Sequence, residues 1–308
     1  PKDGYFAVRE AFAPIAVSLR VDRFSCYAGE IVAIEAWLAN DTNLSPTDYT
    51  LHYQVEDASG NLVASGGGDA VIEPCQANYQ GDISLEVPAT IEARTKLSVT
   101  LVLIDHNGQA IHQCQQSLIV FPQPRLNALT VFGAGCNEDG EAAKIQKFLG
   151  AKSVDSISEA DTLIVDDVDT FEQQKTAILD AVNNGSLLVL LSLPVGVHQI
   201  ADSKIEIEKT GMCERHFVSR DTKHPVVSEL EENDVRFWYN DDLGYISPFC
   251  RTYITPHPSL QPILTTGTGN SGFGGPDEWS PVVAAGEMAH GAGRIRICQL
   301  ELGNRINR

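Results

Sequence analysis

The chain has 308 residues, of which 43% are hydrophobic and 20% are charged, so it can bury the cores of two ordinary domains. With 41 acidic against 22 basic residues its formal net charge is −19, which repels phosphate backbones and anionic lipid surfaces. We therefore expect no nucleic acid and no membrane as partners, and no apolar run reaches the roughly eighteen residues that cross a bilayer.

The opening of the chain has the spacing of an amphipathic helix. Tyr5, Val8, Phe12 and Ile15 recur at steps of three, four and three residues, which places large apolar side chains on one helix face. Such a face needs a partner surface, either the domain that follows or a domain upstream. Because the chain also lacks an initiator Met, we expect residues 1–14 to be a terminal helix left from a missing upstream domain.

Residues 15–121 read as strands and turns. Apolar and polar residues alternate over 31–39 and 96–104, and Asp57-Ala-Ser-Gly-Asn61 is a hairpin turn signal. Gly66-Gly-Gly68 indicates a bend or bulge. Seven or eight short strands at this spacing predict an all-β, immunoglobulin-like sandwich. The side chains expected to face its core include Val32, Ile34, Ala36, Leu38, Leu97, Val99, Leu101 and Leu103.

Phe121-Pro-Gln-Pro-Arg125 separates this region from a second one, because two prolines in a polar stretch cannot continue a central strand. We take residues 122–125 as a linker. Beyond it the hydrophobic period predicts strand, helix, strand, helix and strand in that order, and Thr170-Phe-Glu-Gln173 has capping-box spacing. This order predicts a parallel sheet, so we expect residues 126–308 to be a flavodoxin-like α/β domain. Segments 281–288 and 294–302 would form its closing hairpin.

The segment Glu35-Ala-Trp-Leu-Ala-Asn-Asp-Thr42 follows a helix-like, aromatic-rich opening and a short strand. This arrangement resembles the junction of the catalytic barrel and the C-terminal β-domain in family 2 glycoside hydrolases of the β-galactosidase, β-mannosidase and exo-glucosaminidase type. The resemblance implies a parent enzyme that hydrolyses terminal β-linked sugars with retention and without a cofactor. Its two catalytic glutamates would lie on the barrel before Pro1, so we assign no catalytic residue to this chain.

The motifs His224-Pro-Val-Val227, Asp234-Val-Arg-Phe-Trp238 and Val283-Ala-Ala-Gly-Glu287, with the segment 291–299, resemble a second family. They are similar to the class I glutamine amidotransferase-like fold, which some large glycosidases carry as a non-catalytic module. Such enzymes need a Cys on the tight turn after the third strand. That turn reads Leu191-Ser-Leu-Pro-Val-Gly196, and Ser192 lacks a Gly-x-Ser-x-Gly context. The resemblance therefore implies a degenerate domain that keeps the fold and has lost the reaction.

Three motifs suggest bound groups, and each has a plainer explanation. Asp166-Asp-Val-Asp169, between a strand and a helix, would suit a hard cation, but the helix dipole alone favours acidic residues there. Cys213, His216 and His224 have no second pair of zinc ligands nearby. Gly133-Ala-Gly135 lacks the third glycine of a dinucleotide fingerprint, whose place is taken by Glu138. We therefore expect no metal and no cofactor.

Aromatic residues gather in the last third of the chain. Sugar rings stack on aromatic faces, and Trp279 ends the glycine-rich segment that begins at Gly272. We predict Trp279 and Tyr239 as contacts to a carbohydrate or to the missing barrel. The alternatives stay open, because Trp238 and Tyr239 also suit the core of a strand and Trp279 also suits a role in pinning its loop.

The seven cysteines are odd in number and form no Cys-x-x-Cys pair, which favours a reducing compartment, so we expect a cytoplasmic protein. Asn40-Asp-Thr42 and Asn184-Gly-Ser186 match the glycosylation pattern, but such triplets also occur by chance.

These features predict the non-catalytic C-terminal part of a family 2-like glycoside hydrolase. Its role would be to brace the barrel, shape the active-site rim or mediate self-association. Its partners would be the parent's carbohydrate substrate, the upstream barrel and further copies in a homo-oligomer. Two alternatives remain open. A carbohydrate-binding module would bind glycans through Trp279, and a free-standing α/β hydrolase or amidotransferase would use Ser192 as its nucleophile.

Overall fold

The computed structural model describes residues 8, 12–123, 130–134, 139–209, 222–231, 234, 239–240, 245–246, 250–268 and 280–303. The chain divides into two compact units, unit 1 (Pro1–Pro124) and unit 2 (Arg125–Arg308). In the described ranges no helix combines the length and apolarity needed to cross a membrane. Most of the expected terminal helix lies outside the described residues; Val8 is helical, and its carbonyl accepts a hydrogen bond from the Phe12 N–H at 3.1 Å.

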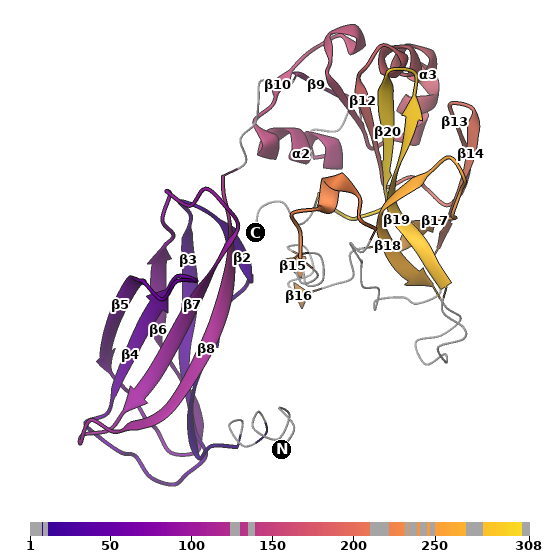
Figure 1. Cartoon of the computed structure of the whole chain (residues 1–308). Helices are drawn as coiled ribbons and strands as arrows, with labels where there is room; N and C mark the ends of the chain where they lie inside the picture. The colour runs from indigo at the N-terminus through magenta and orange to yellow at the C-terminus, as the bar shows by residue number, and fades with distance from the viewer. Residues whose placement is uncertain are drawn as a thin grey trace. The chain divides into compact units, whose positions relative to one another are not determined.

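Unit 1 is a sandwich of two β-sheets (Figure 1). One sheet has the order β1-β3-β6 and the other the order β2-β8-β7-β4-β5, and only β2 and β8 pair in parallel among the described strands of this unit. This confirms the expected all-β sandwich. The strands are β1 (Ile15–Arg20), β2 (Ser25–Tyr27), β3 (Ile31–Asn40), β4 (Thr50–Glu56), β5 (Leu62–Asp69), β6 (Gln76–Glu86), β7 (Thr95–Ile104) and β8 (Ala110–Phe121).

The alternation of the sequence decides which strand faces are buried in unit 1. In β3 the buried side chains are Val32, Ile34, Ala36 and Leu38, and in β7 they are Leu97, Val99, Leu101 and Leu103. Successive strand residues point to opposite faces, so these two strands present their apolar sides to each other across the sandwich. Both predicted faces are confirmed.

The glycine run of β5 is a correction to the expected bend or bulge. Gly66-Gly-Gly68 lies within a continuous strand paired with β4, and the register shift in this pair lies instead between Val55 and Glu56. A Cβ on Gly66 would meet the Tyr53 ring at 2.6 Å, and one on Gly67 would meet the Leu51 carbonyl oxygen. Close packing against β4 therefore requires glycine at positions 66 and 67.

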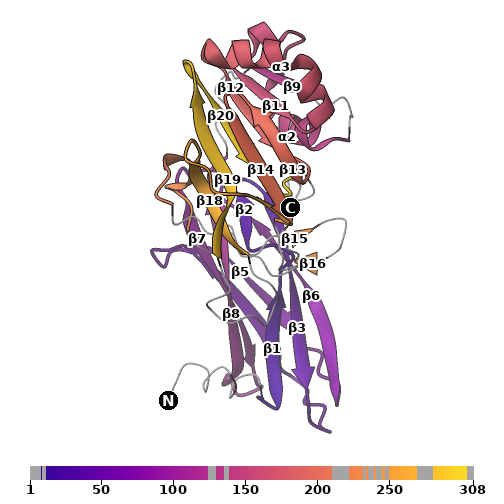
Figure 2. The ribbon, with the colours of Figure 1, turned by 90° about the vertical axis from the view of Figure 1, so that its right-hand side faces the viewer.

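Unit 2 is built on a ten-stranded mixed sheet of order β10-β9-β11-β12-β20-β19-β17-β14-β13, with β18 paired to β19. Figure 2 shows β12, β20 and β19 side by side. Its elements are β9 (Thr130–Ala134), α2 (Glu141–Leu149), β10 (Lys152–Ser153), η1 (Ile157–Glu159), β11 (Thr162–Val165), α3 (Val168–Asn183), β12 (Leu187–Leu191), β13 (Gly196–Ile200), β14 (Ser203–Lys209), η2 (Pro225–Val227), β15 (Tyr239–Asn240), β16 (Tyr245–Ile246), β17 (Thr252–Ile254), β18 (Gln261–Thr268), β19 (Ser280–His290) and β20 (Gly293–Cys298).

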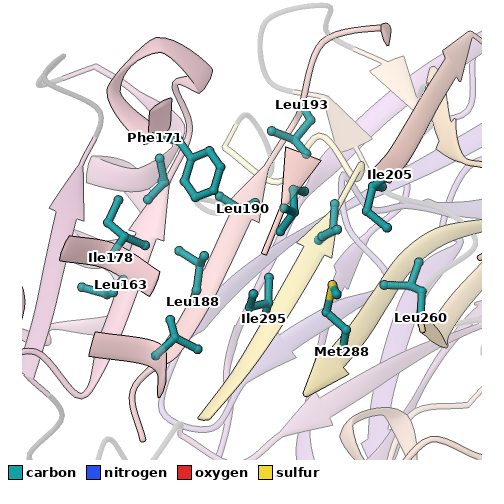
Figure 3. Packing of buried hydrophobic residues seen from close by; sticks show 14 of the residues in the cluster. Leu163, Phe171, Ile178, Leu188, Leu190, Leu193, Ile205, Leu260, Met288 and Ile295 are labelled. Carbon is teal, nitrogen blue, oxygen red and sulfur yellow. The ribbon is translucent and has the colours of Figure 1, made fainter. Parts of the chain in front are cut away.

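The two described α-helices of unit 2 cover opposite faces of its parallel strands. Phe171 and Ile178 of α3 pack with Leu163, Leu188 and Leu190, as Figure 3 shows. On the other face Ala142 of α2 packs with Val131, Ile164 and Leu191. Neighbouring residues of one strand, such as 163 and 164, thus belong to different cores, which explains why these strands are apolar on both sides.

The expected flavodoxin-like, amidotransferase-like domain is not supported by this sheet as a whole. Strands β10, β9, β11, β12 and β20 are mutually parallel, in line with the predicted β-α-β-α-β order. Beyond β20 the sheet continues through antiparallel strands. The reason is visible in β14, whose buried and exposed residues alternate, a pattern that favours hairpins over helical crossovers. The predicted closing hairpin of β19 and β20 is confirmed.

The predicted capping box at Thr170 is wrong. Helix α3 begins three residues earlier, and its N-cap is Asp167, whose carboxylate accepts from the Thr170 N–H at 2.8 Å and the Thr170 hydroxyl at 2.6 Å. Thr170 is therefore the third residue of the helix and the partner of the cap.

Candidate functional site

The carboxyl ends of the parallel strands bring several predicted residues to one edge of the unit 2 sheet. Asp166 directly follows β11 and Ser192 directly follows β12. Leu191, the last residue of β12, pairs with Cys298, the last residue of β20. Ligands in open α/β sheets bind at this edge, so it is the first place to look for chemistry.

Ser192 lies where a nucleophile elbow would be, on the turn directly after β12, although the strand β13 and not a helix follows this turn. Its φ is +49°, in the left-handed region that non-glycine residues seldom adopt. Its N–H donates to the Cys298 carbonyl at 2.9 Å, and its exposed hydroxyl donates to Oε2 of Glu141 at 2.8 Å. Asp48, Cys75, Ala201 and Lys223 also have positive φ. The strained conformation alone therefore does not mark Ser192 as a nucleophile.

Glu141 is the residue of this edge that sequence reasoning missed. It opens α2, and its Oε1 accepts hydrogen bonds from the backbone N–H groups of Leu302 at 2.6 Å and Gly303 at 2.8 Å. One carboxylate thus ties together α2, the turn after β12 and the chain beyond β20. An acidic residue in a first helical turn is common, so no sequence signal linked Glu141 to Ser192.

The N–H group that would complete an oxyanion hole is already in use. In a nucleophile elbow, the backbone N–H of the residue after the nucleophile stabilises the oxyanion. That residue is Leu193. The Gln299 side-chain amide is oriented so that each of its polar atoms has a hydrogen-bond partner. The amide oxygen of Gln299 accepts from the Leu193 N–H at 3.2 Å, and the amide nitrogen of Gln299 donates to the Leu193 carbonyl at 3.2 Å. Gln299 is buried, so this pairing is shielded from water.

The two carboxylates after β11 cap helices. Asp166 accepts from the Ala142 N–H in the first turn of α2 at 2.8 Å, and its other oxygen is buried without a hydrogen-bond partner. Hydrogen bonds from Thr170 hold the pKa of the Asp167 carboxyl below its usual value. The described residues contain no group of three or more His, Cys, Asp or Glu side chains that could hold a metal ion. Helix capping accounts for this acidic run.

Among the described residues, two thiols lie near this edge, and burial disfavours the thiolate form of both. Burial raises the pKa of Cys298 to about 12. Burial, with a smaller contribution from Cys298, raises the pKa of Cys250 to about 12 as well. A thiol must lose its proton to act as a nucleophile, so neither replaces the cysteine that an amidotransferase requires.

His224 is a buried structural residue. Its Nδ1 accepts from the Val226 N–H at 3.2 Å, which caps η2, and its Nε2 lies 3.7 Å from Oε1 of Glu287. Glu287 in turn pairs with Arg294 and Arg296, each at 2.7 Å. The other members of the suggested zinc group, Cys213 and His216, lie outside the described residues.

The side chains of the predicted carbohydrate contacts, Trp279 and Tyr239, lie outside the described part of the chain. Trp279 and Trp238 lie outside the described residues. The backbone of Tyr239 forms β15 and pairs with Ile246 of β16, while its side chain lies outside the described part. Gly133, from the suggested phosphate loop, lies close to Gln146 of α2. A Cβ added to Gly133 would lie 2.8 Å from Oε1 of Gln146. Gly135 and Glu138 lie outside the described residues.

A hollow of about 840 Å³ lies at the opposite edge of the same strands. Its lining includes Asp161, which directly precedes β11, and Ser186, which directly precedes β12. The Asp161 carboxylate accepts from the Thr130 hydroxyl at 2.7 Å and the Thr130 N–H at 3.1 Å, and Ser186 donates to the Ala160 carbonyl at 2.8 Å. These groups join strand starts, and α3 contributes Gln174 and Asp180 to the lining of the hollow.

No protein-family model and no curated protein sequence matches the chain. Among solved structures, a β-glucuronidase from glycoside hydrolase family 2 is 10% identical, with 60% of this chain and 22% of that chain covered and a TM-score of 0.29. A putative β-galactosidase from Bacteroides fragilis is 12% identical, with 59% and 28% covered and a TM-score of 0.27. The sporulation control protein Spo0M from Bacillus subtilis is 12% identical, with 35% and 49% covered and a TM-score of 0.28.

This chain thus spans less than half the length of each of these three proteins. At these TM-scores the overlaps carry no argument about fold or function.

Proposed function

We propose that the chain supplies non-catalytic C-terminal domains of a family 2-like glycoside hydrolase that acts on terminal β-linked sugars. Its domains brace the catalytic barrel, shape the rim of the active site or hold copies of the enzyme together. The observation that carries the non-catalytic part is the state of the elbow. The Ser192 hydroxyl donates a hydrogen bond to Glu141, and the Leu193 N–H donates one to Gln299. The Glu141 carboxylate also accepts hydrogen bonds from the Leu302 and Gly303 N–H groups.

The elbow lacks what a serine nucleophile needs. A hydroxyl is activated by a base that is free to take its proton, usually a histidine held by a third group. Within the described residues, the side chain that hydrogen-bonds to the Ser192 hydroxyl is that of Glu141. Because that carboxylate already accepts two backbone N–H groups, its position suits a tie between segments.

The motif behind the glycosidase resemblance has a structural role in unit 1. Asn40 is fully buried at the end of β3; its amide nitrogen donates to the carbonyls of Leu44 at 2.8 Å and Glu73 at 3.0 Å. Its oxygen accepts from the Thr42 N–H and the Thr42 hydroxyl. Asn40 thus shapes the turn after β3, which supports a scaffolding role and leaves no free amide for glycosylation.

The test compares the 308-residue chain with its natural full-length protein on chromogenic β-galactosides, β-glucosides, β-mannosides and β-glucuronides. We expect turnover by the full-length protein alone, and kcat/KM within about twofold of wild type in its Ser192→Ala variant, because Ser192 takes no part in the chemistry. Turnover by the 308-residue chain, lost in Ser192→Ala, would instead establish the hydrolase alternative. A full-length protein that hydrolyses none of these glycosides would refute the assignment to this class of enzyme.

A further inference from the structure

The outer face of the β1-β3-β6 sheet carries a pair of aromatic rings. Trp37 of β3 lies opposite Tyr79 of β6, with ring centroids 5.5 Å apart and the ring planes inclined by 58°. Ala36 and Leu38, the neighbours of Trp37 along β3, point into the core, so the Trp37 ring lies on the solvent side of the sheet. Tyr79 pairs with Trp37, so its ring lies on the same side. Tyr79 is 49% exposed and Trp37 is half-buried. Figure 2 shows the three strands side by side.

A β-bulge brings the two rings together. The register of β3 and β6 shifts between Ala36 and Trp37: Ala36 pairs with Gly81, and Trp37 pairs with Tyr79. The extra residue is Gln80, which would oppose Trp37 if the register were regular. Gly81 supplies a φ of +127°, and the Gln80 amide bonds the N–H and the carbonyl of Val71, each at 2.9 Å. Such bulges re-aim side chains at sheet edges.

Two carboxylates on the same face hold the polar atoms of the rings. The Trp37 Nε1–H donates to Oε2 of Glu35 at 2.7 Å, and Arg20 lies 3.6 Å from the same oxygen. A hydrogen bond with Asp82 raises the pKa of the Tyr79 hydroxyl. The rings are therefore fixed in orientation before any ligand arrives, which lowers the entropy lost on binding.

Polar residues lie on one side of the rings, and the small side chains of Ala16, Ala39 and Ala77 lie on the other. Ser18 lies opposite Trp37 on β1, Arg20 lies opposite Glu35, and on β6 Asp82 and Ser84 are exposed. A protein-binding surface has a wider apolar centre around its aromatic anchors. A pyranose ring instead presents C–H groups to an aromatic face and hydroxyl groups to carboxylates, serines and arginine. The net charge of −19 on the chain disfavours an anionic sugar.

We propose that Trp37 and Tyr79, with Glu35, Asp82 and Arg20, form a binding platform for a neutral β-linked oligosaccharide. The choice of a β linkage rests on the proposed function, whereas the platform itself does not. Within the carbohydrate-binding alternative it adds Trp37 and Tyr79 to the predicted contact Trp279.

The test titrates the 308-residue chain with cellohexaose, β-1,4-mannohexaose and a β-1,4-galactan oligosaccharide, followed by calorimetry and by nuclear magnetic resonance of the protein. We expect at least one probe to bind, and Trp37→Ala and Tyr79→Ala each to weaken binding by about tenfold or more, as truncated aromatic anchors do. Tyr79→Phe keeps the ring and should lose about threefold or less, since only its hydroxyl bond is removed.

Phe24→Ala is the matched control, because Phe24 is 42% exposed in unit 1 outside the β1-β3-β6 sheet; its affinity should equal that of the wild type. Circular dichroism confirms that each variant is folded. The proposal is overturned if no probe binds at millimolar concentration, or if binding survives both alanine substitutions. It is equally overturned if these substitutions abolish self-association in sedimentation velocity while sugar binding is absent.

Discussion

The elbow of unit 2 and the aromatic face of unit 1 differ in where their functional groups point. At the elbow, the hydroxyl, the oxyanion-type N–H and the carboxylate are bonded to one another or to nearby backbone. On the unit 1 face, hydrogen bonds hold only the polar atoms of Trp37 and Tyr79, and the exposed part of Tyr79 remains open to a ligand. The shape of a site is thus a weaker guide to function than the availability of its groups.

This contrast predicts that substitutions in the polar network of unit 2 change stability, while substitutions on the unit 1 face change binding. The largest stability effect is expected at Glu287, whose side chain is 7% exposed and pairs with Arg294 and Arg296. Glu287→Ala leaves two guanidinium groups without their anion, and we expect a loss of about 3 kcal/mol in the free energy of unfolding. Urea denaturation measures it; a loss below about 1 kcal/mol would contradict this view of the cluster.

The same residue gives a pH dependence with a definite sign. Burial alone would raise the pKa of Glu287, but hydrogen bonds from Arg296 and Arg294 outweigh it and hold the pKa below its usual 4.5. A carboxyl whose pKa is lowered on folding stabilises the fold above its unfolded pKa and loses that contribution as the pH falls. The stability difference between wild type and Glu287→Gln should therefore be constant above pH 4.5 and shrink below it. A difference that grows on acidification would reverse the sign.

A smaller loss is expected at the tie in the elbow. Glu141→Ala removes the acceptor of the Ser192 hydroxyl and of the Leu302 and Gly303 N–H groups, and we expect a loss of about 2 kcal/mol. Hydrogen exchange should also show faster exchange of the Leu302 and Gly303 amides. Glu141→Gln, which keeps an acceptor oxygen, is the control and should recover part of the loss. Unchanged exchange in Glu141→Ala would show that the tie does not hold the C-terminal segment.

Still smaller is the expected effect of Ser192→Ala. It removes one exposed hydroxyl that donates a single hydrogen bond, while the left-handed backbone remains. We expect a change of about 1 kcal/mol or less, measured by urea denaturation. Ser192→Gly, which relieves the positive φ, should be as stable as Ser192→Ala or more stable. A lower stability of the glycine variant would contradict the assignment of strain to this residue.

The smallest effect on stability is expected at Tyr79, because the unit 1 face is predicted to serve binding whereas the polar network of unit 2 serves stability. Tyr79→Ala should leave the melting temperature within about 2 °C of wild type, because its side chain is exposed on the outer face, while sugar binding weakens by about tenfold or more. A large drop in melting temperature would show that the aromatic pair stabilises the sandwich, and differential scanning fluorimetry decides this.

The sequence predicted the elements whose burial follows a simple period. The alternation in β3 and β7 decided which residues enter the core of unit 1. The apolar run of β12 and the spacing of α2 and α3 indicated parallel strands with crossover helices. Each of these signals is local, because one strand or helix shows its buried side in its own residues. The start of α3 was misplaced because Asp167 and Thr170 satisfy different capping patterns three residues apart.

What the sequence did not predict depends on long-range contacts. Glu141 and Ser192 are 51 residues apart, and each alone looks ordinary. Trp37 was noted only within the junction motif, because its pairing with Tyr79 requires a bulge at Gln80 that no periodicity shows. The pairing of β17 with β14 and β19 was missed because it joins distant positions, such as Ile254 and Val283.

The most direct test of the central claim, that the elbow is closed by its own hydrogen bonds, is labelling of the 308-residue chain with a fluorophosphonate probe. Intact-protein mass spectrometry reads the result, with Ser192→Ala as the control. We expect no adduct on Ser192, because its hydroxyl has no free base and the neighbouring N–H is bonded to Gln299. A stoichiometric adduct that disappears in Ser192→Ala would show an activated nucleophile and contradict the account.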